Sequence, residues 1–91
     1  MTRQRITDKH LDGCCETLNL LLGRPVAPWQ DGQSQAGCIH IDSSYGCVGI
    51  AEMTGNGGGT RSLACGLSKR EAWEWLCACI RGVQMAQESN A

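Results

Sequence analysis

The spacing of apolar residues changes twice along this 91-residue chain, and the change limits the folds that it can adopt. Near both ends, apolar residues recur about every three or four positions, which is typical of a helix with one buried face. In the middle they alternate with other residues, which is typical of strands. Helices at the two ends can bury their apolar sides only against the strands or each other, so the sequence predicts one small α+β domain.

The first predicted helix covers residues 7–22. Thr7 is a suitable N-cap, and Gly23 is a suitable stop because glycine readily adopts the left-handed conformation at a helix end. Leu20 points away from the apolar stripe of this helix. It either widens the buried face or belongs to a contact surface.

The last predicted helix begins after Ser68, which forms an S-x-x-E capping box with Glu71. Trp75 falls at the boundary of its apolar arc, beside Glu71 and Ala78. The sequence turns polar near its end. We therefore expect residues 86–91, like residues 1–5, to be flexible termini.

Three strands are predicted between the helices. Residues 38–42 and 47–53 alternate on either side of a turn that contains Tyr45, and residues 60–65 form a third, less regular strand. We predict the order helix, three-stranded antiparallel sheet, helix (α-β-β-β-α). Both helices are expected on one face of the sheet, since this arrangement buries both apolar stripes.

The segment 24–37 connects the first helix to these strands. It holds both prolines of the chain together with several polar residues, which predicts a loop. Within it, Trp29 either packs against the edge of the core or begins a short edge strand. We expect Trp29 to cover the core, because large aromatic side chains mostly supply burial; an exposed binding residue is the alternative.

Composition and charge exclude several classes of protein. No apolar run approaches the roughly 18 residues of a membrane span, and no apolar stretch follows the basic start, so we expect neither an anchor nor a signal peptide. Seven cysteines without a CxxC pair predict reduced thiols in a cytosolic protein, not a disulfide framework or a zinc site. The net charge of -1 disfavours nucleic acid as the partner. We expect no metal and no cofactor.

The strongest candidate for chemistry is the row formed by Cys38, His40 and Asp42 on one side of the first strand. A histidine oriented by an aspartate could activate a thiol for nucleophilic attack. Successive members of such a row are about 6.6 Å apart, which is too far for direct hydrogen bonds. A solvent-facing polar row explains these residues better, so the sequence predicts that the protein is not an enzyme.

The order of elements, the segment GCIH that ends at His40, and the helix start GLSKREA resemble the double-stranded-RNA-binding domain. That resemblance implies a histidine-bearing loop and a phosphate-binding helix start, here Lys69 and Arg70, with Arg61 as a further basic contact. The sequence departs from the family pattern, because Trp73 replaces a further lysine and GCIH lacks a proline. Duplex nucleic-acid binding is therefore the alternative function.

A longer resemblance covers nearly the whole chain. The segments LNLLLGRPVAPW, IDSSYG and GGGTRSLACGLSKREAWEWLCACIRGV resemble short uncharacterised proteins of tailed phages and prophages. Cys47 stands where that set has the second glycine of a YGG turn. The resemblance implies a phage-encoded accessory protein that works in the host cytoplasm, and it brings no established activity.

We therefore predict a small non-enzymatic protein that binds a host or phage protein through an exposed patch. Apolar side chains outside a core often mark such surfaces. The candidate contact residues are Leu20, Trp29, Tyr45 and Trp75.

Overall fold

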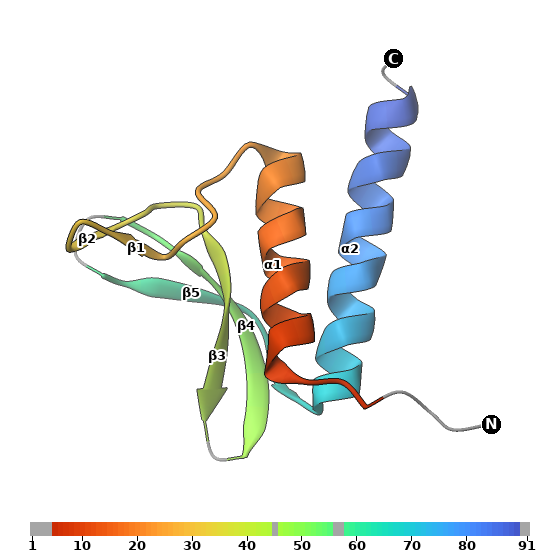
Figure 1. Cartoon of the computed structure of the whole chain (residues 1–91), viewed down its shortest axis with the longest axis horizontal. Helices are drawn as coiled ribbons and strands as arrows, with labels where there is room; N and C mark the ends of the chain where they lie inside the picture. The colour runs from red at the N-terminus through yellow and green to blue at the C-terminus, as the bar shows by residue number, and fades with distance from the viewer. Residues whose placement is uncertain (1–4, 45, 56–57, 90–91) are drawn as a thin grey trace.

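The structure is a computed structural model that describes residues 5–44, 46–55 and 58–89. In chain order its elements are α1 (Asp8–Leu22), β1 (Trp29–Gln30), β2 (Gln33–Ser34), β3 (Ile39–Ser44), β4 (Cys47–Met53), β5 (Thr60–Leu67) and α2 (Lys69–Ser89). Strands β3, β4 and β5 form one antiparallel sheet in that order, and β1 and β2 form a separate hairpin (Figure 1). The predicted α+β class is confirmed, with two additional short strands before the three-stranded sheet.

Both helices begin at the predicted capping residues. Thr7 Oγ1 accepts a hydrogen bond from the His10 backbone N–H, and the His10 ring accepts one from the Thr7 N–H. Gly23 ends α1 in the left-handed conformation with φ 70°. At α2, Ser68 Oγ accepts from the Glu71 N–H at 3.1 Å, and the Glu71 carboxylate accepts from the Ser68 N–H at 2.9 Å. The hydrogen bonds from Ser68 lower the pKa of Glu71.

The core lies between the sheet and the helices. Helix α1 packs against β3 and α2, and α2 also packs against β4 and β5 (Figure 1). The buried residues that form this core are Ile6, Leu11, Cys15, Leu18, Ile39, Val48, Ile50, Ala72 and Leu76. The predicted alternation in β4 is confirmed from Cys47 to Ile50, because Val48 and Ile50 are buried in this core whereas Cys47 is exposed. Beyond Ile50 it is wrong, because Ala51, Glu52 and Met53 are all buried and the pairing with β5 is irregular between Ile50 and Ala51.

A buried asparagine, which the sequence analysis did not single out, joins α1 to β3. Asn19 has no exposed surface. Its side-chain amide donates to the Ile39 carbonyl at 2.9 Å, and the Ile39 N–H donates to its side-chain carbonyl at 2.9 Å. Strand β3 is an edge strand, so Asn19 replaces the backbone partner that a further strand would have supplied.

The segment 24–37 contains a hairpin. Trp29 pairs with Ser34 across a turn at Asp31 and Gly32, whose φ values of 53° and 78° are both positive. Asp-Gly favours the tight turn that joins two strands in this way, so the hairpin had a local sequence signal. The expectation that Trp29 covers the core is wrong, because 54% of its surface is exposed. The alternative interpretation, in which Trp29 begins a short strand, is confirmed.

Helices α1 and α2 lie side by side and run in the same direction (Figure 1). Helix α2 continues through Ser89 and so includes residues 86–89 of the predicted flexible tail. The Gln87 side chain donates to the Leu21 carbonyl at 2.9 Å and ties the end of α2 to the end of α1. Within the described parts of the chain, neither helix has the length and apolarity needed to cross a membrane.

Candidate functional site

An apolar groove of about 470 Å³ runs between α1, α2 and the sheet. Helix α1 contributes Leu18 and Leu22, and α2 contributes Trp75, Val83 and Ala86. Strands β3 and β5 supply further apolar side chains. The volume falls within the range of roughly 300 to 1,000 Å³ that is typical of binding sites.

The groove exists because the second half of α2 does not pack closely on the sheet. Ala72 and Leu76, in its first half, are fully buried, whereas Cys79 and Val83 are only partly buried. Gly82 presents no side chain, and a Cβ placed there would meet no described atom within 4 Å beyond its own stretch of helix. The protein's own side chains therefore leave this space unfilled.

Three charged residues, which we call the ion cluster, lie where the groove ends: Arg24, Glu52 and Arg61. Glu52 is only 8% exposed. Arg24 Nη1 lies 2.7 Å from Glu52 Oε2, and Arg61 bonds the other carboxylate oxygen. Arg24 also donates to the Gly37 carbonyl at 3.3 Å. A buried carboxylate requires such partners, because an unpaired charge in this position would be strongly destabilising.

A second, more polar hollow adjoins the groove at the ion cluster. It has a volume of about 540 Å³, includes Arg24, Glu52 and Arg61 in its lining, and extends over residues 36–37 and 53–54. The ion cluster is thus the boundary between an apolar and a polar surface. This arrangement suits a ligand that is apolar at one end and anionic at the other.

The four residues predicted for protein binding do not form one patch. Trp75 is partly buried and lines the groove. Leu20 is 66% exposed and lies about 200° around α1 from the groove residue Leu18. Trp29 is on the β1–β2 hairpin and is not among the residues that line the groove. Tyr45 lies outside the described residues.

Three of the residues predicted for nucleic-acid binding have partners within the chain. Lys69 Nζ lies 3.3 Å from Asp8 Oδ1, and both side chains are exposed. The Arg70 guanidinium lies 5.9 Å from the centre of the Trp73 ring. Arg61 belongs to the ion cluster. Two of these positive groups, Lys69 and Arg61, are therefore partly neutralised by a carboxylate within the chain.

The fourth residue of this set, His40, lies in strand β3 and not in the loop that the resemblance to the double-stranded-RNA-binding domain implies. It borders a hollow that Asp12 and Glu16 also line. Its Nε2 atom is buried and has no hydrogen-bond partner among the described atoms. Carboxylates in the same hollow would repel a phosphate, so His40 has unfavourable surroundings for RNA.

The row Cys38, His40 and Asp42 is not arranged as a nucleophilic site. Cys38 is fully buried, and its thiol accepts a contact from the Asn19 amide at 3.6 Å. Burial raises the pKa of Cys38, which keeps it in the less reactive thiol form. No hydrogen bond joins these three side chains in the described structure.

The remaining thiols range from buried through partly buried to exposed. Burial raises the pKa of Cys15 to about 12. Burial raises the pKa of Cys14, and the neighbouring thiol of Cys77 on α2 raises it further. Cys47 and Cys65 are exposed. Within the described ranges, no group of three or more His, Cys, Asp or Glu residues is placed to hold a metal ion.

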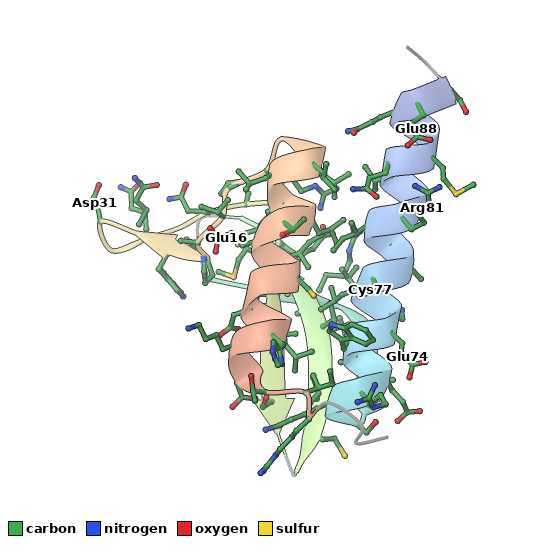
Figure 2. The ribbon with its side chains drawn as sticks, turned by 45° about the vertical axis from the view of Figure 1, so that its right-hand side comes forward. Glu16, Asp31, Glu74, Cys77, Arg81 and Glu88 are labelled. Carbon is green, nitrogen blue, oxygen red and sulfur yellow. The ribbon has the colours of Figure 1, made fainter. Side chains whose placement is uncertain are left out.

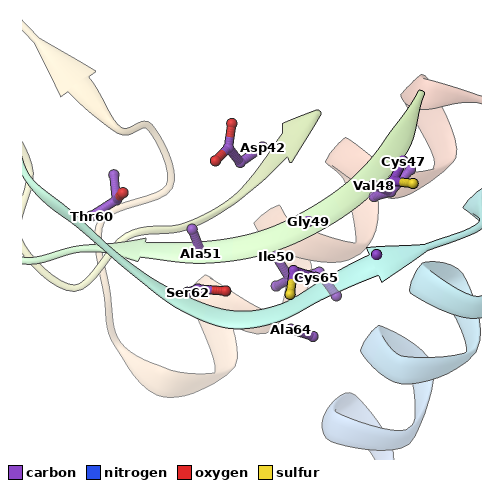
Figure 3. A pocket seen from close by; sticks show the side chains of 11 residues that line it. Asp42, Cys47, Val48, Gly49, Ile50, Ala51, Thr60, Ser62, Ala64 and Cys65 are labelled. Carbon is purple, nitrogen blue, oxygen red and sulfur yellow. The ribbon is translucent and has the colours of Figure 1, made fainter. Parts of the chain in front are cut away.

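A depression on the three-stranded sheet is a smaller hollow (Figure 3). Small residues such as Gly49, Ala51 and Ser62 line it, and its volume is about 90 Å³. That volume is well below the roughly 300 Å³ at which small-molecule sites begin. The groove beside α2 is therefore the stronger candidate.

The fold and the groove define a small α+β domain with a candidate docking surface. No protein family, no curated protein and no solved structure matches the chain.

Proposed function

We propose that this protein is a small non-enzymatic binding module that docks a partner protein in the apolar groove. The observation that carries the proposal is the unfilled space between α2 and the sheet, where Leu22, Trp75 and Val83 present apolar surface. Apolar surface left open beside a polar rim is typical of protein interfaces. The resemblance to phage and prophage proteins supports a host or phage protein as the partner and the host cytoplasm as the compartment.

The groove changes which residues we expect to contact the partner. Trp75 keeps its predicted role, and Leu22 and Val83 are added to it. Leu20 and Trp29 lie outside the groove, so alanine at either position should leave partner binding intact.

Site-specific photo-crosslinking in the host cell tests the proposal. A photoreactive amino acid at Val83, inside the groove, should give a discrete adduct with one protein. The same amino acid at Glu74, which is exposed and does not line the groove, should give none (Figure 2). Equal adducts from both positions, or no adduct from Val83, would argue against docking in the groove.

A blocking variant separates docking from folding. Gly82→Leu should fill the groove, because a side chain at Gly82 meets open space. Gly13→Leu is the matched control, since Gly13 is an exposed helical glycine on α1 with equally open surroundings. Leucine is a better helix former than glycine, so neither change should unfold the protein. We expect only Gly82→Leu to remove the adduct at Val83; an undiminished adduct would count against the groove.

Weak duplex nucleic-acid binding is the second candidate, because Lys69 and Arg70 lie in the first turn of α2, where a helix favours anions. If it is the function, duplex RNA or DNA should shift the amide NMR signals of this turn at low salt. The binding should weaken steeply as salt rises and be lost in a Lys69→Gln/Arg70→Gln variant. We expect a flat titration, because Lys69 is paired with Asp8 and the net charge is -1.

A further inference from the structure

The ion cluster carries one more positive charge than negative charge. Arg24 and Arg61 are permanently charged, and Glu52 is the one acidic residue among the described residues that line the groove and the polar hollow. Both carboxylate oxygens of Glu52 already accept from an arginine. Glu52 therefore forms an ion pair with each arginine, but its single negative charge neutralises only one of their two positive charges.

The arginines retain the capacity to bind a further anion. A guanidinium has five N–H donors, and the hydrogen bonds to Glu52 and the Gly37 carbonyl use only part of this capacity. The Arg61 side chain is 68% exposed, so a ligand in the groove can reach it. The donors of Arg61 thus lie at the polar end of an apolar surface.

The length of the groove suits a helix of a partner protein. Along α2 the lining extends from Trp75 to Ala86, a rise of about 16 Å, or roughly three helical turns. An amphipathic helix can place apolar side chains at positions three and four residues apart along such a groove. A nucleic acid would bring its charged backbone against apolar walls, which the groove does not favour.

We propose, building on the docking function above, that the occupant is an amphipathic helix of a partner protein whose apolar face fills the groove. One aspartate or glutamate at the end of that face bonds Arg61, with Arg24 nearby. The apolar residues supply the area buried, and the carboxylate sets the register of the helix, because a charge-assisted hydrogen bond has a defined geometry.

Selection from a library of random peptides, each long enough for about four helical turns, tests this inference. Against the unaltered protein, we expect enrichment of peptides with apolar residues at helical spacing and an acidic residue at one end. Replacing that acidic residue by its amide should weaken binding about tenfold or more. Enrichment of peptides without an acidic residue would overturn the inference.

Two variants identify the residue responsible. Arg61→Gln should bind the acidic peptide and its amide version equally well. Arg81 is on the exposed side of α2, and its Nη1 atom lies 3.7 Å from Glu88 Oε1 (Figure 2). Arg81→Gln should therefore still prefer the acidic peptide over its amide version, as the unaltered protein does. An Arg61→Gln protein that still prefers the acidic peptide would contradict the assignment to Arg61.

Sedimentation of the free protein tests whether a second copy of the chain occupies the groove. A protein that sediments as a dimer and enriches no peptide would assign the groove to self-association and overturn the inference. The failure of this inference can be distinguished from the failure of the docking function. If Val83 gives adducts in cells but the selected peptides lack an acidic residue, the protein docks a partner in the groove and that partner is not an acidic helix.

Discussion

Asn19 and Ile39 exchange two hydrogen bonds of 2.9 Å between helix α1 and the edge strand β3, and both residues are buried. Edge strands ordinarily leave such backbone groups to water or to another strand. Here one side chain satisfies both groups and fixes the position of α1 on the sheet. The same contact sets the place of Leu18, which lies one residue earlier on α1 and lines the groove.

Replacing Asn19 by alanine should destabilise the protein strongly. The N–H and the C=O of Ile39 would both lose their side-chain partner in a buried site. Each such loss costs about 1 to 3 kcal/mol, so we expect a decrease of roughly 2 to 6 kcal/mol in the free energy of unfolding. Urea denaturation measures it. Thr17→Ala, on the exposed face of α1, is the control and should change stability by less than about 0.5 kcal/mol. Similar costs for the two variants would contradict this role of Asn19.

The two arginines of the ion cluster should contribute unequally to stability. The Arg24 side chain is 38% exposed and also bonds the Gly37 carbonyl, whereas the Arg61 side chain is 68% exposed. We expect Arg61→Gln to cost less than about 1 kcal/mol, as exposed ion pairs do. Arg24→Gln should cost about 1 to 3 kcal/mol, because it removes two hydrogen bonds, one of them to a buried carboxylate.

Chemical denaturation of both variants at low and high salt measures the difference. A larger cost at Arg61 would show that Arg61 is held for structure and not for a ligand.

Stability should fall in alkaline solution, and Cys15 should account for part of the fall. Burial raises the pKa of Cys15 from 9.0 to about 12. Between about pH 9 and about pH 12 the unfolded chain releases this proton while the folded chain keeps it, so the folded state binds more protons and loses stability as pH rises. Below pH 9 the contribution is fully present. Denaturation curves across this range should be less pH-dependent for Cys15→Ala than for the unaltered protein. If Cys15→Ala leaves the slope of stability against pH unchanged, Cys15 does not contribute to the loss of stability in alkaline solution.

Alkylation should separate the cysteines by burial. Cys47 and Cys65 are exposed, whereas Cys15 and Cys38 are buried with raised pKa values. Because the thiolate is the reactive form, iodoacetamide under native conditions should modify the exposed pair first. Mass spectrometry of peptides after timed quenching gives the order. Early labelling of Cys38 would show that the edge of β3 opens readily.

Filling the empty position in the groove with a single methyl group should stabilise the protein. Gly82→Ala adds a Cβ in open space and removes the conformational freedom of a helical glycine. We expect a gain of about 0.5 to 1 kcal/mol, and the same gain for Gly13→Ala on α1. Thermal and urea unfolding measure both. A loss of stability specific to Gly82→Ala would mean that α2 packs more closely on the sheet than the groove allows.

The helices and the alternation at the start of β4 could be predicted from the sequence because their signals are local. Thr7 and Ser68 cap the helices through groups only three residues away, and the alternation at Val48 and Ile50 needs no distant partner. The hairpin at Asp31 also had a local signal, an Asp-Gly pair, although its strands of two residues are too short to show a period.

The candidate site was only partly predictable. Trp75 stood out because an aromatic residue at the boundary of an apolar arc is unusual, and it does line the groove. The position of Leu20 on the helix left two alternatives open, and its exposure of 66% excludes the wider buried face. Neither pattern could give the size of the groove, because that depends on how closely the second half of α2 approaches the sheet.

The sequence by itself determined two amphipathic helices, their caps and the main strands between them, because each of these depends on neighbours within a few residues. Only the tertiary structure decided that Asn19 meets Ile39 and that Arg24 and Arg61 share Glu52. These contacts join groups that are far apart along the chain. Their free energy depends on burial and on the register of neighbouring strands, which arise only when the elements pack together.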